Sequence, residues 1–170
     1  MIRLANENDL DSILEIFNEA ILNTTSIYTY KPQTYEDRKA WFDKKMEEGF
    51  PVFVFEMDDR VVGFAAYGPF RPFPAYKYTI EHSVYVHKDY RGKGIGEKLL
   101  IQLINSANTR GYATMIAGID SLNEKSISLH KKLGFVYSGT INKAGFKFSK
   151  WLDLVFYQLD LNGPTEPLDG

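Results

Sequence analysis

The sequence predicts a mixed α/β fold in which helices cover both faces of one sheet. Apolar runs rich in β-forming residues alternate along the chain with segments whose apolar residues recur at helical spacing. The 170 residues, 44% of them hydrophobic, can bury one substantial core but are few for two. We therefore expect a single domain over residues 1–161 and a flexible C-terminal tail over residues 162–170.

The first half of the chain predicts a strand, two helices and three further strands. Asn8 and Asp9 are candidate caps for the first helix, and Thr34 with Asp37 for the second, which ends before Gly49. The turn residues Asp58 and Asp59 separate two apolar runs into a hairpin. In chain order these elements are strand 2–5, helix 8–21, helix 34–48, strands 52–55 and 61–67, and strand 78–86.

The second half predicts two more helices and three more strands. Gly111 ends the first of these helices and Gly134 the second. The elements are a helix from about residue 95 to 110, strand 114–119, helix 123–133, and strands 135–144 and 151–161. The complete order, β-α-α-β-β-β-α-β-α-β-β, implies a mixed sheet.

Composition narrows the possible partners. The formal net charge of −2 and the absence of a polybasic run give no indication of nucleic-acid or membrane binding. There is no cysteine, and three scattered histidines do not suggest a metal site, so we expect no metal. No apolar stretch approaches the roughly 20 residues that span a bilayer, and no secretory leader is recognised. We expect a cytoplasmic protein with a small-molecule partner.

A glycine-rich turn is the first candidate site. In Arg91–Gly96, three glycines at alternate positions leave the N–H groups of Gly92, Lys93, Gly94, Ile95, Gly96 and Glu97 free to converge at a helix start, where the dipole favours an anion. Arg91 and Lys93 add charge suited to a pyrophosphate. The alternative is a turn that only reverses the chain. The spacing fits neither a Walker loop nor a dinucleotide fingerprint, which disfavours NAD.

The turn Arg91–Gly96 resembles the pyrophosphate loop of GNAT acetyltransferases. The preceding residues Val84, Tyr85 and Val86 resemble the strand that carries the pantetheine arm there, and the pattern from Asn123 through Ser126 and His130 to Phe135 resembles the second signature of that superfamily. The resemblance implies the GNAT acyl-CoA N-acyltransferase fold and acetyl-CoA as co-substrate. Asn123 would contact the cofactor, cap its helix, or do both.

The resemblance narrows to the branch of phosphinothricin and methionine sulfone/sulfoximine acetyltransferases. It is carried by Gly68–Arg71, Thr79–Val86, and Lys147 with Trp151 and Asp153. This branch implies acetylation of the α-amine of small amino-acid analogues. It also implies a homodimer formed through the last strands, to which Trp151, Phe156 and Tyr157 contribute unless they belong to the core.

Glu81 is the candidate general base. In strand 78–86 it points to the face opposite His82 and Val84. A carboxylate inside an apolar strand either pairs with a cation or amide or acts as a base, directly or through a water, and the branch resemblance places its base here. Deprotonating a lysine side chain at pH 7 costs about 4.6 kcal/mol and an α-amine only about 1 kcal/mol, so an α-amine is the easier substrate.

His130 occupies the position where many GNAT enzymes carry a tyrosine that protonates the leaving thiolate. An unperturbed histidine is only about a quarter protonated at pH 7, so a role of His130 as acid depends on its environment. The alternatives are a base, a group that orients the substrate, or a structural residue packed near the sheet. We interpret His82 as structural and His87 as solvated.

The substrate side is expected in the loop after residue 67. Arg71 would pair with a carboxylate, phosphinate or sulfone oxygen, or else stack on the surface. Phe73, Tyr76 and, by alignment, Tyr28 would line an apolar pocket for a methionine-like side chain. Phe73 replaces an arginine of the phosphinothricin enzymes, which favours methionine sulfone or sulfoximine.

Two alternatives remain for the activity. A peptide or protein N-terminal acetyltransferase would need an open groove in place of the aromatic loop. A non-catalytic acyl-CoA-binding regulator would keep the glycine turn and lose catalysis, against which Glu81 and His130 argue.

Overall fold

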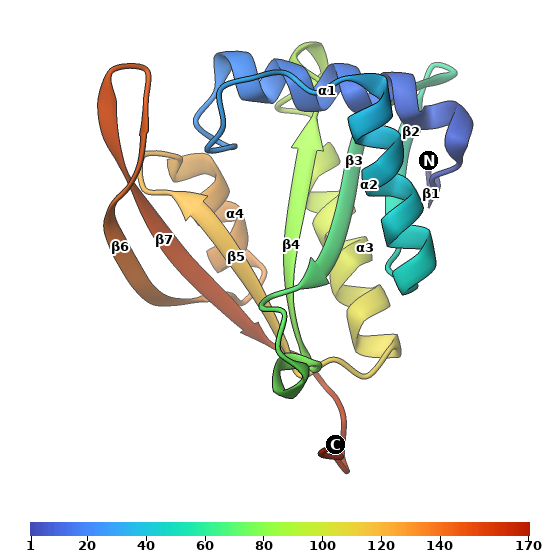
Figure 1. The fold of residues 1–170 in the computed structure, drawn as a ribbon, viewed down its shortest axis with the longest axis vertical. Helices are drawn as coiled ribbons and strands as arrows, with labels where there is room; N and C mark the ends of the chain where they lie inside the picture. Colours follow the sequence, from blue (N-terminus) through green and yellow to red (C-terminus); the bar gives the residue numbers. More distant parts are fainter. The chain divides into compact units, whose positions relative to one another are not determined.

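A computed structural model describes residues 1–170 and confirms the mixed α/β fold and the predicted element order (Figure 1). Seven strands form one sheet in the order β1-β2-β3-β4-β5-β7-β6. β4 and β5 are parallel, whereas β1–β2, β2–β3, β5–β7 and β6–β7 are antiparallel. The elements are β1 Ile2–Leu4, α1 Leu10–Asn23, α2 Tyr35–Glu48, β2 Val52–Met57, β3 Arg60–Pro69, β4 Thr79–Val86, α3 Ile95–Thr109, β5 Thr114–Asp120, α4 Glu124–Lys132, β6 Val136–Lys147 and β7 Lys150–Asp160.

The chain divides into two compact units, which we describe separately. The first comprises Met1–Tyr67 with Ser83–Leu103, and the second comprises Gly68–His82 with Ile104–Gly170. β4 runs through both, so Glu81 and His82 belong to the second unit and Val84 to Val86 to the first.

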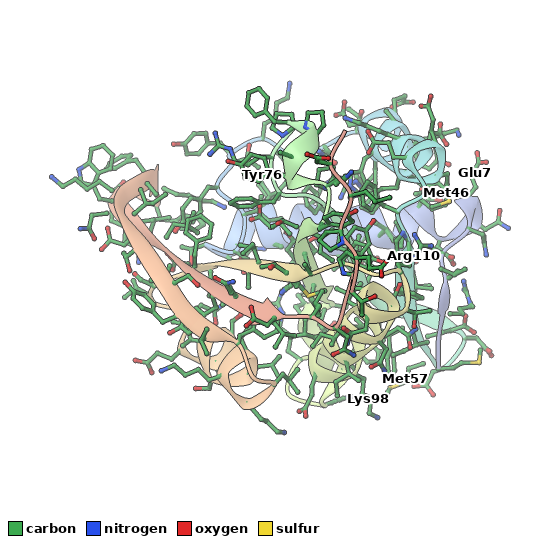
Figure 2. All side chains as sticks on the ribbon, turned by 90° about the horizontal axis from the view of Figure 1, so that it is seen from below. Glu7, Met46, Met57, Tyr76, Lys98 and Arg110 are labelled. Atoms are coloured by element: carbon green, nitrogen blue, oxygen red, sulfur yellow. The ribbon has the colours of Figure 1, made fainter.

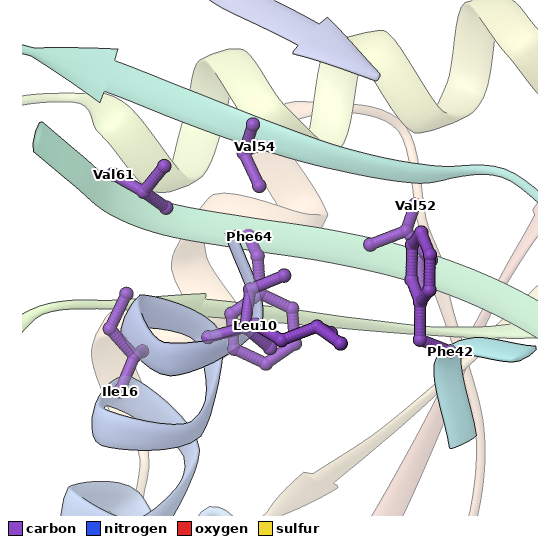
Figure 3. Packing of buried hydrophobic residues seen from close by; sticks show 9 residues of the cluster. Leu10, Ile16, Phe42, Val52, Val54, Val61 and Phe64 are labelled. Atoms are coloured by element: carbon purple, nitrogen blue, oxygen red, sulfur yellow. The ribbon is translucent and has the colours of Figure 1, made fainter. Parts of the chain in front are cut away.

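The core of the first unit lies between α1, α2 and the strands β2 and β3. Leu10 of α1 lies beside Phe64 and Phe42 of α2 beside Val52, and Ile16 of α1 belongs to the same cluster (Figure 3). This is the apolar helical face that the spacing predicts. The buried members of the cluster are Leu10, Ile13, Ile16, Phe42, Val52, Val54, Val61, Phe64 and Ala66.

The termini of the first helices follow local chemistry. Thr34 and Asp37 form the predicted capping box of α2, and Gly49 ends that helix with a left-handed φ of 77°. Asp9 is the N-cap residue of α1, as predicted, but its side chain makes no capping hydrogen bond to that helix. Asn6 caps a short 3₁₀ turn that precedes it, while the carboxylate of Asp9 accepts the Asn6 N–H and pairs with Arg3.

The second unit contains a long hairpin of β6 and β7 (Figure 1). The expected strand 135–144 was too short, because β6 continues to Lys147 and pairs there with Lys150, whereas the expected strand 151–161 differs from β7 by one residue at each end. Phe148 and Ser149 make the connection at positive φ, which neither residue type indicates in a sequence. No helix of the protein combines the length and the apolarity that a membrane span requires.

The C-terminal residues contain no helix or strand beyond β7. The Asn162 N–H donates to Asn108 Oδ1, and the Leu168 N–H donates to the Tyr78 hydroxyl. The flexibility expected of residues 162–170 stays a prediction.

Candidate active site

The glycine turn adopts a backbone that glycine permits. Gly92 and Gly94 have φ values of 78° and 77°, and a Cβ added at either would meet nothing within 4 Å. The Gly94 carbonyl accepts the Lys98 N–H at 3.2 Å and so begins the hydrogen-bond ladder of α3. The N–H groups of Ile95 and Gly96 therefore have no acceptor within the helix. This arrangement suits a bound anion.

Arg91 is anchored to its own unit. Its guanidinium pairs with Glu19 of α1, and its Nε donates to the Val86 carbonyl at 3.1 Å. Lys93 is exposed, with its Nζ 4.8 Å from the Tyr90 ring centroid. Arg91 therefore holds the turn against β4 and α1, and Lys93 is the cation with greater freedom to meet an anion.

The end of β4 lies against the start of α3. A Cβ added at Gly96 would stand 3.7 Å from Val86 Cγ2 and 4.0 Å from Val84 Cγ1, so the two elements approach closely there. The Tyr85 ring instead packs against Phe64, with the ring centroids 5.2 Å apart. Its side chain belongs to the core of the first unit.

Glu81 lies half-buried in β4 of the second unit. Burial raises the pKa of the Glu81 carboxyl, and no cation or hydrogen-bond donor offsets the rise. The structure therefore does not support the alternative of a carboxylate paired with a cation or amide. Gly118 of β5 lies beside it, since a Cβ added at Gly118 would come within 3.2 Å of Glu81 Oε1.

His130 lies on α4 and contacts His82, whose side chain points to the face of β4 opposite Glu81. Its Nδ1 is 2.6 Å from the Ser126 carbonyl oxygen, and its Nε2 is 3.0 Å from His82 Nε2. Burial lowers the pKa of His130, so the imidazole is neutral at pH 7. The structure does not bring His130 and Glu81 together.

The start of α4 carries the other two predicted residues of the second signature. Asn123 caps the helix, and its side chain accepts the Ser126 N–H at 3.2 Å. Ser126 Oγ lies 3.4 Å from His130 Nδ1. The capping interpretation of Asn123 is confirmed, and its contact with a cofactor stays a prediction.

The residues predicted to meet the acceptor lie in different units. In the second unit, the Arg71 guanidinium is 5.9 Å from the ring centroid of Tyr76. Tyr76 is labelled in Figure 2. Phe73 is 64% exposed. Tyr28 lies in the connection between α1 and α2 of the first unit.

Sequence reasoning missed or misjudged three residues. Gly118 interrupts an apolar strand, and an isolated glycine there often indicates a close approach. His82 contacts His130, which the sequence spacing does not reveal. The interpretation of His87 as solvated was wrong: it is buried, with its Nε2 3.1 Å from Arg60 and 3.3 Å from Glu15. No group of three or more histidine, cysteine or acidic side chains is placed to hold a metal ion.

The raised pKa of Glu81 predicts a pH-dependent stability difference. Between the ordinary carboxyl pKa and the raised value, the folded chain keeps a proton that the unfolded chain has released, so the free energy of unfolding falls as the pH rises through this window. Glu81→Gln removes this loss. We expect the variant to gain stability relative to wild type as the pH rises, measured by urea unfolding from pH 4 to 8. A constant difference would contradict the prediction.

The conformation of the turn predicts how acetyl-CoA affinity responds to substitution. Gly94→Ala forces a Cβ into a left-handed backbone and into the open side of the turn, so we expect an affinity loss of about tenfold by calorimetry. Gly49→Ala is the matched control, because Gly49 has the same φ of 77° and equally open surroundings at the end of α2. Equal affinity of both variants would contradict an anion-binding turn.

Comparison with known proteins agrees with this geometry. Residues 10–135 match the model of the Acetyltransferase (GNAT) family. The chain is 47% identical over 165 residues to an L-methionine sulfoximine/L-methionine sulfone acetyltransferase of Pseudomonas paraeruginosa, covering 96% of this chain and 95% of the relative.

Two solved structures are similar over nearly the whole chain. A phosphinothricin acetyltransferase from Sinorhizobium meliloti in complex with AcCoA has a TM-score of 0.95 and 36% identity, covering 100% of this chain and 94% of its own. A ribosomal-protein-alanine N-acetyltransferase from Brucella melitensis has a TM-score of 0.93 and 45% identity, covering 95% and 99%. Together with the glycine turn and the buried carboxylate, these similarities show that the chain belongs to the GNAT family of acetyltransferases.

Proposed function

We propose that the protein transfers the acetyl group of acetyl-CoA to the α-amine of small amino-acid analogues of the methionine sulfone, methionine sulfoximine and phosphinothricin type. The observation that carries the proposal is Glu81, a carboxylate held in a strand without a compensating cation. Relatives named for these acceptors align over almost the entire chain.

Glu81 would remove the proton that keeps the amine from attacking. Its raised pKa makes it a stronger base than an exposed carboxylate, and an α-amine gives up its proton more easily than a lysine. Gly118 lets β5 approach the carboxylate closely, because a Cβ at this position would lie 3.2 Å from Glu81 Oε1. Acetyl-CoA supplies the activated acetyl group as a thioester.

The first unit would hold the acetyl-CoA phosphates. The N–H groups from Gly92 to Glu97 and the Lys93 ammonium supply the positive potential, while Arg91 keeps the turn in place. Val84, Tyr85 and Val86 would bind the pantetheine arm through their backbone, consistent with the packing of the Tyr85 ring in the core. Asn123 and Ser126 stay proposed cofactor contacts through the resemblance of their motif to the second GNAT signature.

Arg71 and its aromatic neighbours would select the acceptor. A guanidinium forms bidentate bonds with a carboxylate, and it binds a phosphinate or sulfone oxygen as well. Phe73 and Tyr76 are exposed enough to close over an apolar side chain. Tyr28 is proposed as a member of this group on the family resemblance alone.

A second candidate acceptor is the N-terminal amine of a protein. Similarity to the ribosomal-protein-alanine N-acetyltransferase of Brucella melitensis, at 45% identity, favours this acceptor. An N-terminal amine and a free α-amine have similar pKa values, so Glu81 would serve either. A non-catalytic acyl-CoA-binding role is the third candidate, and the unpaired Glu81 argues against it.

Acetyl transfer to a panel of amines tests the proposal. We expect release of CoA thiol with methionine sulfone, methionine sulfoximine or phosphinothricin to exceed that with methionine or an alanine-initiated peptide. Glu81→Gln should lower kcat on the order of a hundredfold or more and leave acetyl-CoA affinity unchanged. Glu166→Gln, an exposed change of the same kind, is the control.

The outcome for the peptide separates the candidates. Faster turnover of the peptide would replace the small-molecule acceptor by a protein N-terminus. Acetyl-CoA binding without turnover of any acceptor would leave only the binding role.

We also propose that residues 1–161 act as one catalytic domain, with residues 162–170 as a flexible tail, in a cytoplasmic homodimer. The proposal of one catalytic domain is supported by the similarity to an acetyltransferase over 96% of this chain and 95% of the relative. Exposed apolar side chains on the β6–β7 hairpin support the dimer, and Trp151 is one of them, whereas Tyr157 is buried. The exposed set is Val136, Tyr137, Ile141, Phe146, Phe148 and Trp151.

Loss of one exposed aromatic side chain tests the dimer. Trp151 is 59% exposed, and its ring lies against Phe146, so Trp151→Lys places a charge within the apolar set. We expect sedimentation velocity to show a dimer for wild type and a monomer for this variant. Met46→Lys on α2 is the control for an exposed apolar residue elsewhere. A monomeric wild type would refute the proposal.

A further inference from the structure

His82 and His130 form a coplanar, hydrogen-bonded pair. Their ring planes differ by 3°, their centroids are 5.1 Å apart, and their Nε2 atoms are 3.0 Å apart. This centroid separation is close to the largest that such a nitrogen contact allows, so the rings meet edge to edge. Phe135 stands nearly perpendicular to both, at 79° and 78°, and fixes their common plane.

The protons of this pair follow from its partners. A carbonyl oxygen only accepts, so the contact of 2.6 Å with Ser126 O requires the proton of His130 on Nδ1. In the neutral imidazole, His130 Nε2 is then an acceptor, and His82 Nε2 must donate to it. Burial lowers the pKa of His130 and lowers that of His82 to about 3, which keeps both rings neutral.

One ring nitrogen remains without a partner. His82 carries its proton on Nε2, so its Nδ1 has a lone pair, and this atom is buried with no hydrogen-bond partner. An unsatisfied buried acceptor lowers the stability of the folded state, and such groups are rare in folded proteins. Both nitrogens of His130, in contrast, are already engaged.

We propose that His82 Nδ1 is a fixed hydrogen-bond acceptor for an N–H group of a bound substrate, and that His130 positions His82 and does not meet the substrate itself. The inference deepens the proposed acetyl transfer and rests on it for the ligand. The N–H donor is either an amide of the acetyl-CoA arm or the amine of the acceptor. This assignment gives His82 the ligand contact expected of His130 and makes His130 an orienting group.

The tautomers are tested without turnover. Nitrogen-15 spectra of histidine-labelled protein report which ring nitrogen carries each proton, and the chain has only three histidines to assign. At pH 7 we expect His130 protonated on Nδ1 and His82 on Nε2, with neither ring charged. A proton on His82 Nδ1, or an imidazolium at either position, would overturn the proposal even if acetyl transfer is confirmed.

Two substitutions separate an acceptor role from a positioning role. In His82→Gln the amide nitrogen takes the place of Nε2 and still donates to His130, but nothing replaces Nδ1. In His82→Phe both nitrogens are lost. We expect both variants to lose about tenfold in acetyl-CoA affinity or in kcat/KM for the amine, with the His130 proton of the Gln variant still on Nδ1. Near wild-type values for His82→Gln would show that His82 only positions His130.

The affected constant identifies the donor. Weaker acetyl-CoA binding by calorimetry in the absence of amine indicates an amide of the cofactor arm, and a higher KM for the amine alone indicates the acceptor. His130→Gln should reproduce a smaller part of either effect, because it acts through the orientation of His82. Wild-type values of both the acetyl-CoA affinity and kcat/KM for the amine in every variant would refute the proposal. The calorimetry remains informative if no acceptor is turned over.

Discussion

The alternation of side chains along β4 is the constraint on which the proposed site depends. Glu81 and His82 are consecutive, so a strand must direct them to opposite faces. Neither has a charged partner, so partial burial raises the pKa of the carboxyl and burial lowers that of the imidazole, and both changes favour the neutral form. A strand can hold two such groups because its ladder hydrogen bonds and the buried Ile80 beside them fix the backbone.

The glycine turn depends on a second close approach, within the first unit. A Cβ at Gly63 of β3 would come within 3.0 Å of Leu99 Cδ1 and 3.2 Å of Ile95 Cγ2, so the first turns of α3 pack directly on the strand. This contact fixes the start of α3, and Arg91 ties the turn to Glu19 and Val86. The start of α3 and the turn before it are thus anchored before any anion binds, which lowers the entropy cost of binding.

The order of elements could be predicted from the sequence because each helix and strand carries its own signal. The capping box at Thr34 and the helical spacing in α1 are local, and local patterns predict local structure. The contact between His82 and His130, 48 residues apart, depends on how α4 packs on the sheet, and no periodicity encodes it. The turn at Phe148 and Ser149 escaped prediction for another reason, since its positive φ values are imposed by the pairing of β6 with β7.

The separation of Glu81 from the histidine pair has a chemical consequence. If a histidine shared the face of Glu81, the two would form an ion pair, which would lower the pKa of the carboxyl and occupy the lone pairs that a base needs. Because His82 bonds to His130 and His130 bonds to Ser126, the proton of each ring is committed away from Glu81. The carboxylate keeps its raised pKa, and the histidines keep a neutral acceptor. One strand thereby offers a base on one face and a hydrogen-bond acceptor on the other, without either neutralising its neighbour.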